Sequence, residues 1–238
     1  MSTASTTVLI TGGTSGIGRA TAQLFGDQGA TVIVSGRDEV RGREVAAETK
    51  GRFIRADLAS PEDVRRLADE AGEIDVLVNN AGCWELGPSE QTTEAGFDAM
   101  VAVNFRAPFF LTAALAPKMA ARGHGAIVNV STMVAARGAA GMAVYGASKA
   151  ALEALTRSWA AEFGPAGVRV NAVALGPSRT EVTKSMGDML DTLAAASPLG
   201  RANEPDEVAH VIAYLAGEGA RPITGTVLAV DAGRISTL

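Results

Sequence analysis

Seven short apolar runs, each five to seven residues long, recur along the chain and alternate with longer segments rich in alanine. Unbroken apolar runs of this length are typical of strands buried on both faces, and helical segments between them are typical of crossover connections. The alternation therefore predicts an α/β fold with a doubly wound, seven-stranded parallel sheet. The runs are TVLIT (7–11), TVIVS (31–35), RFIRA (52–56), IDVLVNN (74–80), AIVNVS (126–131), VRVNAVA (168–174) and TVLAVD (226–231).

The segments between these runs have the apolar spacing of helices. We expect helices at about 16–28, 38–49, 61–71, 93–122, 144–163 and 204–217, with Pro108 dividing the fourth into two. Segment 176–203 fits neither pattern, because it follows a strand end, mixes Met and Leu with polar residues, and is flanked by Gly and Pro. We interpret it as a mobile flap.

The composition limits the size of the protein and its partners. A chain of 238 residues that is 47% hydrophobic can bury one sizeable core, so residues 1–238 are expected to form a single domain. A net charge of −5 disfavours nucleic acid and anionic membranes, which bind basic surfaces. Cys83 is the only cysteine and the chain has two histidines, so neither an intramolecular disulfide nor a Cys/His zinc cluster is expected.

The apolar stretches look too short or too interrupted to span a bilayer. Residues 1–7 are polar and uncharged, unlike a signal peptide. The sequence therefore predicts a cytoplasmic protein with no membrane partner.

The first apolar run leads into the glycine-rich turn GGTSGIG at 12–18, directly before the first expected helix. A helix N-terminus at the carboxyl end of a strand offers free N–H groups and a partial positive charge to a phosphate. Gly12 would permit the tight turn, Gly16 a close approach to a pyrophosphate, and Gly18 close packing of helix on sheet. A Rossmann-like dinucleotide site is one interpretation. A structural strand-to-helix turn is the other, because the spacing is G-x-x-x-G-x-G and not G-x-G-x-x-G.

The end of the second run bears on which dinucleotide would bind. An acidic residue there binds the ribose hydroxyls of NAD, whereas a small residue with a nearby Arg leaves room and charge for the 2′-phosphate of NADP. The chain has Ser35-Gly36-Arg37, and the planar guanidinium of Arg37 suits a phosphate. NADP(H) is therefore expected over NAD(H), although the acidic Asp38 follows directly.

Tyr145 and Lys149 stand four residues apart at the start of a long alanine-rich helix, so they project from one helix face. An ammonium group beside a phenol favours the phenolate, which lowers a pKa that is ordinarily about 10. Such a tyrosine can exchange a proton with a carbonyl or alcohol oxygen. An ordinary surface pair would show the same spacing.

Taken in order, these motifs closely resemble the short-chain dehydrogenase/reductase family from Thr7 to Gly233, nearly the whole chain. The resemblance implies an NAD(P)-dependent oxidoreductase that interconverts a ketone and a secondary alcohol, similar to the 3-oxoacyl-acyl-carrier-protein reductases. The motifs that carry it are TGGTSGIG (11–18), Asp57-Leu58, NNAG (79–82), Asn104, a hydroxyl residue before the tyrosine, YGASK (145–149) and GPSRT (176–180).

The resemblance also implies roles for single residues. Tyr145 would exchange a proton with the substrate, Lys149 would bind the nicotinamide ribose and depress the tyrosine pKa, and Asn104 would hold a water for proton relay. Asp57 would contact adenine, and the loop at 176–180 would fix the carboxamide and diphosphate. The expected cofactor-binding residues are Gly12, Thr14, Ser15, Gly16, Ile17, Gly18, Arg37, Asp57, Leu58, Asn80, Ala81, Gly82, Tyr145, Lys149, Gly176, Pro177 and Thr180.

The catalytic hydroxyl departs from the family pattern, which has a serine thirteen residues before the tyrosine. That position holds Thr132, with Ser131 beside it. Thr132 is the first choice, because threonine has the same hydrogen-bonding capacity, and strand alternation would point Ser131 to the opposite face. Two further departures are Leu175, where the family normally has Pro, and Ala232, where Gly is common. Ala232 is interpreted as a turn that needs one glycine fewer.

The substrate is expected to be a medium-sized, mostly apolar ketone or alcohol, because the expected pocket wall combines Cys83 and Trp84 with several Met residues, and methionines adapt to irregular ligands. An acyl-carrier substrate is a second possibility, with Arg122, Arg137 and Arg179 as candidate docking residues. The family resemblance implies a homo-oligomer, a tetramer or dimer, formed through helices 93–122 and 144–163 and the last strand. The alternative function is a catalytically weak NADP(H)-binding regulatory protein of the same fold.

Overall fold

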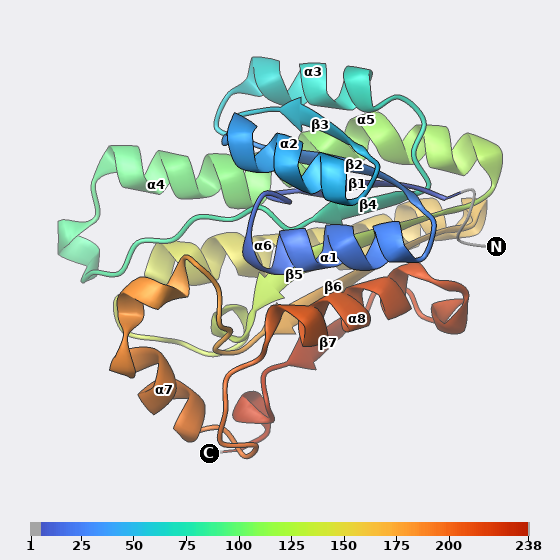
Figure 1. Ribbon diagram of the computed structural model, residues 1–238. Helices are drawn as coiled ribbons and strands as arrows, with labels where there is room; N and C mark the ends of the chain where they lie inside the picture. Colours follow the sequence, from blue (N-terminus) through green and yellow to red (C-terminus); the bar gives the residue numbers. More distant parts are fainter. Residues whose placement is uncertain (1–5, 238) are drawn as a thin grey trace.

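A computed structural model of the protein describes residues 6–237 and contains one sheet of seven parallel strands in the order β3-β2-β1-β4-β5-β6-β7. The predicted doubly wound α/β fold is confirmed (Figure 1). The strand order reverses between β1 and β4, which is where ligands bind in such sheets. The strands are β1 Thr7–Thr11, β2 Thr31–Gly36, β3 Arg52–Arg55, β4 Val76–Asn79, β5 Gly125–Thr132, β6 Val168–Leu175 and β7 Val227–Val230.

The two faces of the sheet bury separate sets of side chains, because successive residues of a strand point to opposite faces. From β1, Val8 and Ile10 pack with Phe25 of one helical layer, whereas Leu9 packs with Leu111 of the other. Helices α1 (Gly16–Asp27), α2 (Glu39–Glu48) and α8 (Pro205–Ala216) cover the first face, and α3 (Pro61–Ala71), α5 (Ala107–Arg122) and α6 (Ala143–Phe163) cover the second (Figure 1).

Two helices begin at side-chain caps that can be found in the sequence. Asp38 accepts a hydrogen bond from the Arg41 N–H at the start of α2, and Ser60 accepts one from the Asp63 N–H at the start of α3. Such caps satisfy N–H groups that the helix itself leaves without a partner. The observed bounds lie within one or two residues of the expected ones in these helices.

The segment expected to form two helices is one helical run. Helix α4 (Glu94–Val101) continues through a π-helical turn (Ala102–Arg106) into α5. Pro108 lies in the first turn of α5, and because proline has no N–H, the chain takes the wider turn before it. Residues Glu94–Arg122 are long and apolar enough to cross a membrane by length and composition, so the expectation that every apolar stretch is too short or too interrupted to do so was wrong. Half of the most apolar part is nevertheless buried in the fold, as in a core helix.

The expected flap carries a helix that the sequence pattern did not predict, α7 (Asp188–Ala195). Residues 178–199 stand away from the sheet beyond its carboxyl edge (Figure 1).

The turn after β7 also differs from expectation. Ala232 takes φ 55°, a left-handed conformation that favours glycine, so the alanine there does not show that the turn needs one glycine fewer.

Candidate active site

The glycine-rich turn lies at the carboxyl end of β1 and borders a cleft of about 820 Å³. Gly12 takes φ 63°, which glycine adopts without strain. A Cβ atom on Gly18 would lie 2.3 Å from the carbonyl oxygen of Gly12, so α1 approaches the turn at a distance that only glycine allows. The turn needs these glycines for its own structure, whatever ligand it holds.

Two features of the cleft provide polar groups suited to a dinucleotide. Helix α1 begins without a side-chain cap from Ser15 and without an acidic residue in its first turn. The hydroxyl of Ser35, at the end of β2, is buried, borders the cleft and has no hydrogen-bond partner among residues 6–237. Free N–H groups at a helix N-terminus bind phosphate, and a spare hydroxyl can bind a ribose or phosphate oxygen. The cleft therefore fits a dinucleotide.

Most of the residues that the sequence predicts to bind the cofactor border this cleft. Four expected residues do not border the cleft: Tyr145 and Lys149 belong to α6, and Gly176 and Pro177 follow β6. The expected residues on the lining are Gly12, Thr14, Ser15, Gly16, Ile17, Gly18, Arg37, Asp57, Leu58, Asn80, Ala81, Gly82 and Thr180.

Asn80 connects the turn after β4 to the glycine-rich turn. Its side-chain amide donates to the carbonyl oxygens of Thr11 at 2.9 Å and Gly12 at 3.2 Å, and its backbone N–H donates to the Thr11 hydroxyl at 3.1 Å. These bonds span the point where the strand order reverses. Asn80 thus fixes the two walls of the cleft relative to each other, a role that the turn-forming tendency of Asn alone would not show.

Tyr145 and Thr132 meet beside this cleft. Thr132 ends β5, Tyr145 lies in the first turn of α6, and the two side chains lie close enough for Thr132 to influence the pKa of Tyr145. Burial raises the pKa of Tyr145, and the nearby Thr132 hydroxyl offsets part of that rise. The i, i+4 spacing predicted that Lys149 lowers the pKa of Tyr145. In the chain alone the pKa of Tyr145 is raised instead, because burial is the largest influence on it. A phenol with a raised pKa is protonated at neutral pH.

Ser131 points away from Tyr145. Its hydroxyl donates to Glu153 Oε1 at 2.6 Å, and both side chains are buried. Thr132, by contrast, donates to the Leu175 carbonyl at 3.4 Å and accepts from the Val134 N–H at 3.3 Å. The hydroxyls of Ser131 and Thr132 therefore have different hydrogen-bond partners on opposite faces of β5, as strand alternation predicts.

The ammonium group of Lys149 is buried and donates to the Val130 carbonyl oxygen at 2.8 Å. Burial lowers its pKa from 10.5 to about 8, because a charged group loses solvation inside the protein. A Cβ on Gly82 would lie 3.3 Å from Lys149 Nζ, which puts this group against the wall of the cleft formed by residues 80–82.

Asn104, in the π-helical turn, joins three segments. Its Oδ1 accepts from the Cys83 N–H at 2.9 Å, and its Nδ2 donates to the Cys83 carbonyl at 2.8 Å and to Ser148 Oγ at 3.1 Å. The side chain is fully buried, so its amide is used to hold the loop after β4 against α6. Burial raises the pKa of the Cys83 thiol, which borders the cleft.

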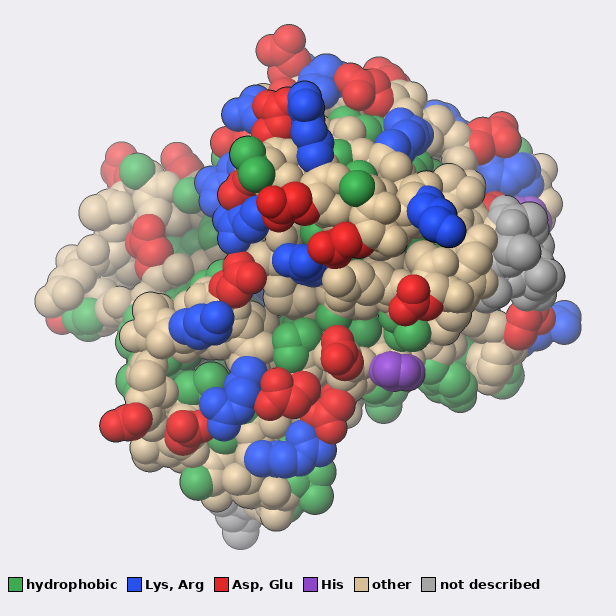
Figure 2. Space-filling model, viewed as in Figure 1, with side chains coloured by type: hydrophobic (Ala, Val, Ile, Leu, Met, Phe, Trp, Pro, Cys, Tyr) green, Lys and Arg blue, Asp and Glu red, His purple; other side chains and the backbone are tan. Residues whose placement is uncertain are grey.

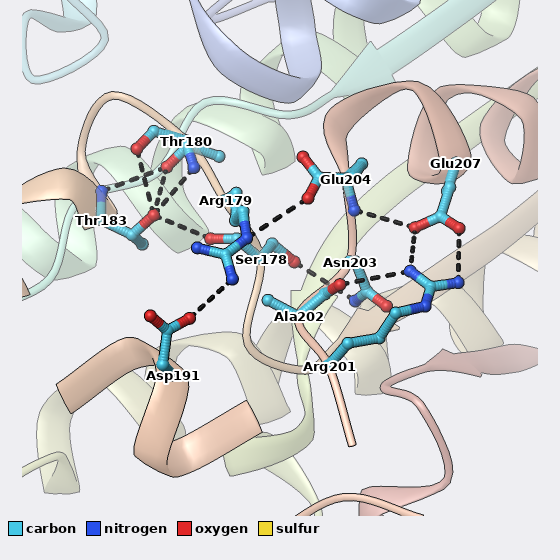
Figure 3. A network of polar contacts seen from close by, with 10 residues as sticks. All are labelled: Ser178, Arg179, Thr180, Thr183, Asp191, Arg201, Ala202, Asn203, Glu204 and Glu207. Atoms are coloured by element: carbon cyan, nitrogen blue, oxygen red, sulfur yellow. Dashed lines mark hydrogen bonds and ion pairs between the residues drawn. The ribbon is translucent and has the colours of Figure 1, made fainter. Parts of the chain in front are cut away.

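The loop after β6 is fixed by a network of polar contacts (Figure 3). Thr183 Oγ1 donates to the Ser178 carbonyl at 2.8 Å and accepts from the Thr180 N–H at 2.8 Å. Arg179 pairs with Asp191 of α7 at 2.6 Å and with Glu204 before α8 at 3.3 Å. The base of the flap is therefore held by hydrogen bonds and ion pairs on both of its sides.

The three arginines considered for docking an acidic carrier protein are all in use elsewhere. Arg122 pairs with Asp75 at 3.4 Å, next to the amino end of β4 and so at the wrong edge of the sheet for this role. Arg179 is paired as described, and Arg137 donates to the carbonyl oxygens of Thr237 and Ile235. On the flap, Leu190 borders a separate cavity near α1 and Met189 is exposed.

Two charged side chains on the cleft lining, Arg41 and Glu181, were not expected to be there. Arg41 could have been found, because it stands four residues after Arg37, in the first turn of the helix that follows β2. Glu181 could not, since only the folded chain brings the flap to α2.

Comparisons with known proteins agree with this geometry. A family model described as Enoyl-(Acyl carrier protein) reductase matches residues 12–234. The 3-oxoacyl-acyl-carrier-protein reductase of Thermotoga maritima is 36% identical over 237 residues, covering 95% of this chain and 96% of the relative. The chain belongs to the short-chain dehydrogenase/reductase family.

Other members of the short-chain dehydrogenase/reductase family differ in the substrates for which they are named. Cis-4-hydroxycyclohexanecarboxylate dehydrogenase of Sinomonas cyclohexanicum is 37% identical over 235 residues, 94% of each chain. A structure described as an NAD(P)-dependent gluconate 5-dehydrogenase of Beutenbergia cavernae with bound NADP is 35% identical, with a TM-score of 0.92 over 98% of this chain and 97% of its own. The family makes this chain an oxidoreductase acting on CH–OH groups.

Proposed function

We propose that this protein reduces a medium-sized, mostly apolar ketone to a secondary alcohol with NADPH, or catalyses the reverse reaction with NADP⁺. The observation that carries the proposal is the position of Tyr145 next to Thr132 at the carboxyl edge of β5, beside the dinucleotide cleft. The bound nicotinamide supplies or accepts the hydride. The protein supplies position and a proton.

Tyr145 is the proton donor in the direction of reduction. Because burial raises its pKa, the phenol keeps its proton at neutral pH and can give it to a carbonyl oxygen as negative charge develops there. Thr132 holds the phenol and orients the same oxygen. Ser131 is excluded from this role in the proposal, because its hydroxyl is committed to Glu153.

Lys149 and Asn104 support the reacting groups. The buried ammonium of Lys149 lies against the cleft wall, where it would bind the nicotinamide ribose. With a pKa of about 8, Lys149 is mostly charged at neutral pH. Asn104 holds the loop after β4 and the start of α6 in register, and proton relay through a water at this residue remains part of the proposal.

The cofactor is NADP(H), held by the glycine-rich turn and by Arg37. Ser35 leaves room at the end of β2 for a 2′-phosphate, and two related structures are described as holding NADP or NADPH. A small-molecule substrate is favoured over an acyl-carrier thioester, because Arg122, Arg137 and Arg179 do not form a free basic surface at the site.

The test is NADPH oxidation with a panel of ketones by the protein and its Tyr145→Phe variant. Removal of the phenolic proton should reduce kcat by about 10²- to 10⁴-fold, while the NADPH dissociation constant, measured by cofactor fluorescence, stays within about twofold because the ring remains. In the protein itself the reduction rate should hold through neutral pH and fall in alkali as Tyr145 loses its proton. Binding of NADPH without turnover of any ketone would instead favour a regulatory protein.

A further inference from the structure

One ion pair crosses from helix α2 to the flap. Arg41 Nη1 lies 2.9 Å from Glu181 Oε2, although the two residues are 140 positions apart in the chain. Arg41 Nε also donates to Asp38 Oδ2 at 2.7 Å. Arg37, Asp38, Arg41 and Glu181 all border the cleft, and acidic and basic side chains intermix over this face of the molecule (Figure 2).

The two carboxylates that bind Arg41 are not equivalent. Asp38 caps α2 through the Arg41 N–H at 3.0 Å, and its hydrogen bonds to Arg41 lower its pKa, so its position and charge are fixed by the helix. Glu181 lies on the flap loop, and its side chain and that of Arg41 are each nearly half exposed. An exposed ion pair is weak and exchanges readily for a stronger partner.

Without a cofactor, the positive and negative charges of the four side chains at this end of the cleft cancel. Arg37 and Arg41 carry two positive charges, and Asp38 and Glu181 carry two negative charges. A phosphate monoester brings a further charge of about −1.5 to −2 and three acceptor oxygens. It would bind Arg41 more strongly than one carboxylate does and would repel Glu181.

We propose that Arg41 is a second ligand of the 2′-phosphate of NADP(H), beside Arg37, and that the phosphate displaces Glu181 from Arg41 and so detaches the flap from α2. The inference rests on the proposed cofactor but not on the reaction that follows. NAD(H), which has a hydroxyl in place of the phosphate, would leave the Arg41–Glu181 pair intact. Glu181 then competes with the 2′-phosphate for Arg41, so it lowers the affinity for NADP(H) but not the affinity for NAD(H).

The competing account is that the ion pair closes the flap over any bound cofactor. In that case the pair would persist in the complex, and loss of either partner would weaken NADPH and NADH equally. The two accounts thus predict opposite signs for a change at Glu181.

The test measures dissociation constants of NADPH and NADH by fluorescence titration, without substrate. Glu181→Gln should tighten NADPH about two- to fivefold and change NADH by less than about 1.5-fold. Arg41→Gln should weaken NADPH about five- to tenfold with little effect on NADH. Glu39→Gln is the matched control, because it removes one carboxylate of an exposed ion pair to Arg43 on the same helix, away from the cleft lining.

The double variant Arg41→Gln/Glu181→Gln completes the cycle. Once Arg41 is gone, removal of Glu181 should no longer tighten NADPH. Equal effects on both cofactors, weaker NADPH binding by Glu181→Gln, or tightening that persists in the double variant would overturn the inference alone. Failure of both cofactors to bind would overturn the proposed function as well.

Discussion

Among residues 6–237, two non-glycine residues take a left-handed backbone conformation, Lys50 and Ala232, and Ala232 lies beside the flap. It takes φ 55° in the turn after β7, where its carbonyl accepts the Leu199 N–H at 3.1 Å and the neighbouring Asp231 accepts from the Gly233 N–H at 2.9 Å. A left-handed conformation costs a residue with a Cβ about 1–2 kcal/mol. The turn is held by these bonds in spite of that cost.

Ala232→Gly should therefore stabilise the protein. Relief of the backbone strain exceeds the greater unfolded-state entropy of glycine, which is about 0.4–1 kcal/mol, so the expected net gain in unfolding free energy is about 0.5–1 kcal/mol. Denaturant titration measures it. Ala229→Gly, in the preceding strand, is the control and should destabilise the protein, because φ is ordinary there. A destabilised Ala232→Gly would show that the alanine is not strained.

Single residues also show where sequence reasoning reached its limit at the site. The alternation of a strand was enough to predict that Thr132 and Ser131 face opposite ways. The pKa of Tyr145 could not be predicted, because spacing places Lys149 one turn away but does not reveal that its ammonium is bonded to the Val130 carbonyl or that burial outweighs charge. Local geometry can be predicted from a periodicity, whereas solvation depends on the whole fold.

At the scale of elements, the strands and most helices could be predicted because their apolar periodicity is set by burial against one sheet. Runs such as 7–11 and 168–174 agree with β1 and β6 to within a residue. Two elements could not be predicted from this periodicity. Helix α7 stands on the flap, where few core contacts impose a pattern, and the π-helical turn at Ala102–Arg106 arises from Pro108 in a segment that otherwise continues as a helix.

The Arg41–Glu181 contact shows the same limit between elements. Caps and i, i+4 pairs are local, so Asp38 and Arg41 could be matched from the sequence. A pair that joins α2 to a flap 140 residues later depends on the tertiary arrangement alone. The residues that decide cofactor preference in the proposed account therefore lie partly outside the family motifs.

At the scale of the whole molecule, helix α5 leaves large apolar side chains uncovered. Phe110 is 53% exposed, and its ring meets that of Phe109 edge to face at a centroid distance of 5.2 Å. Strand β7 ends the sheet and exposes Leu228. Apolar groups of this size on a helix face and a sheet edge are typical of interfaces between subunits.

We therefore predict that the protein is a homo-oligomer and that Phe110→Asp weakens it. A buried carboxylate at an apolar helix interface would cost several kcal/mol, so the variant should shift toward a smaller species at micromolar concentration. Sedimentation analysis measures the change. Val40→Asp, at another exposed apolar residue, on α2, is the control and should leave the assembly unchanged. A monomeric parent protein would contradict the prediction.

The central claim is that a dinucleotide held by the glycine-rich turn presents its nicotinamide to Tyr145. A crystal structure of the protein with NADP⁺ tests this most directly. The account predicts the pyrophosphate at the N-terminus of α1, the ribose at Lys149, and the nicotinamide ring within about 4–5 Å of the Tyr145 hydroxyl, close enough for one carbonyl to meet both. A nicotinamide that lies away from Tyr145, or a Tyr145 hydroxyl turned to solvent in that complex, would contradict it.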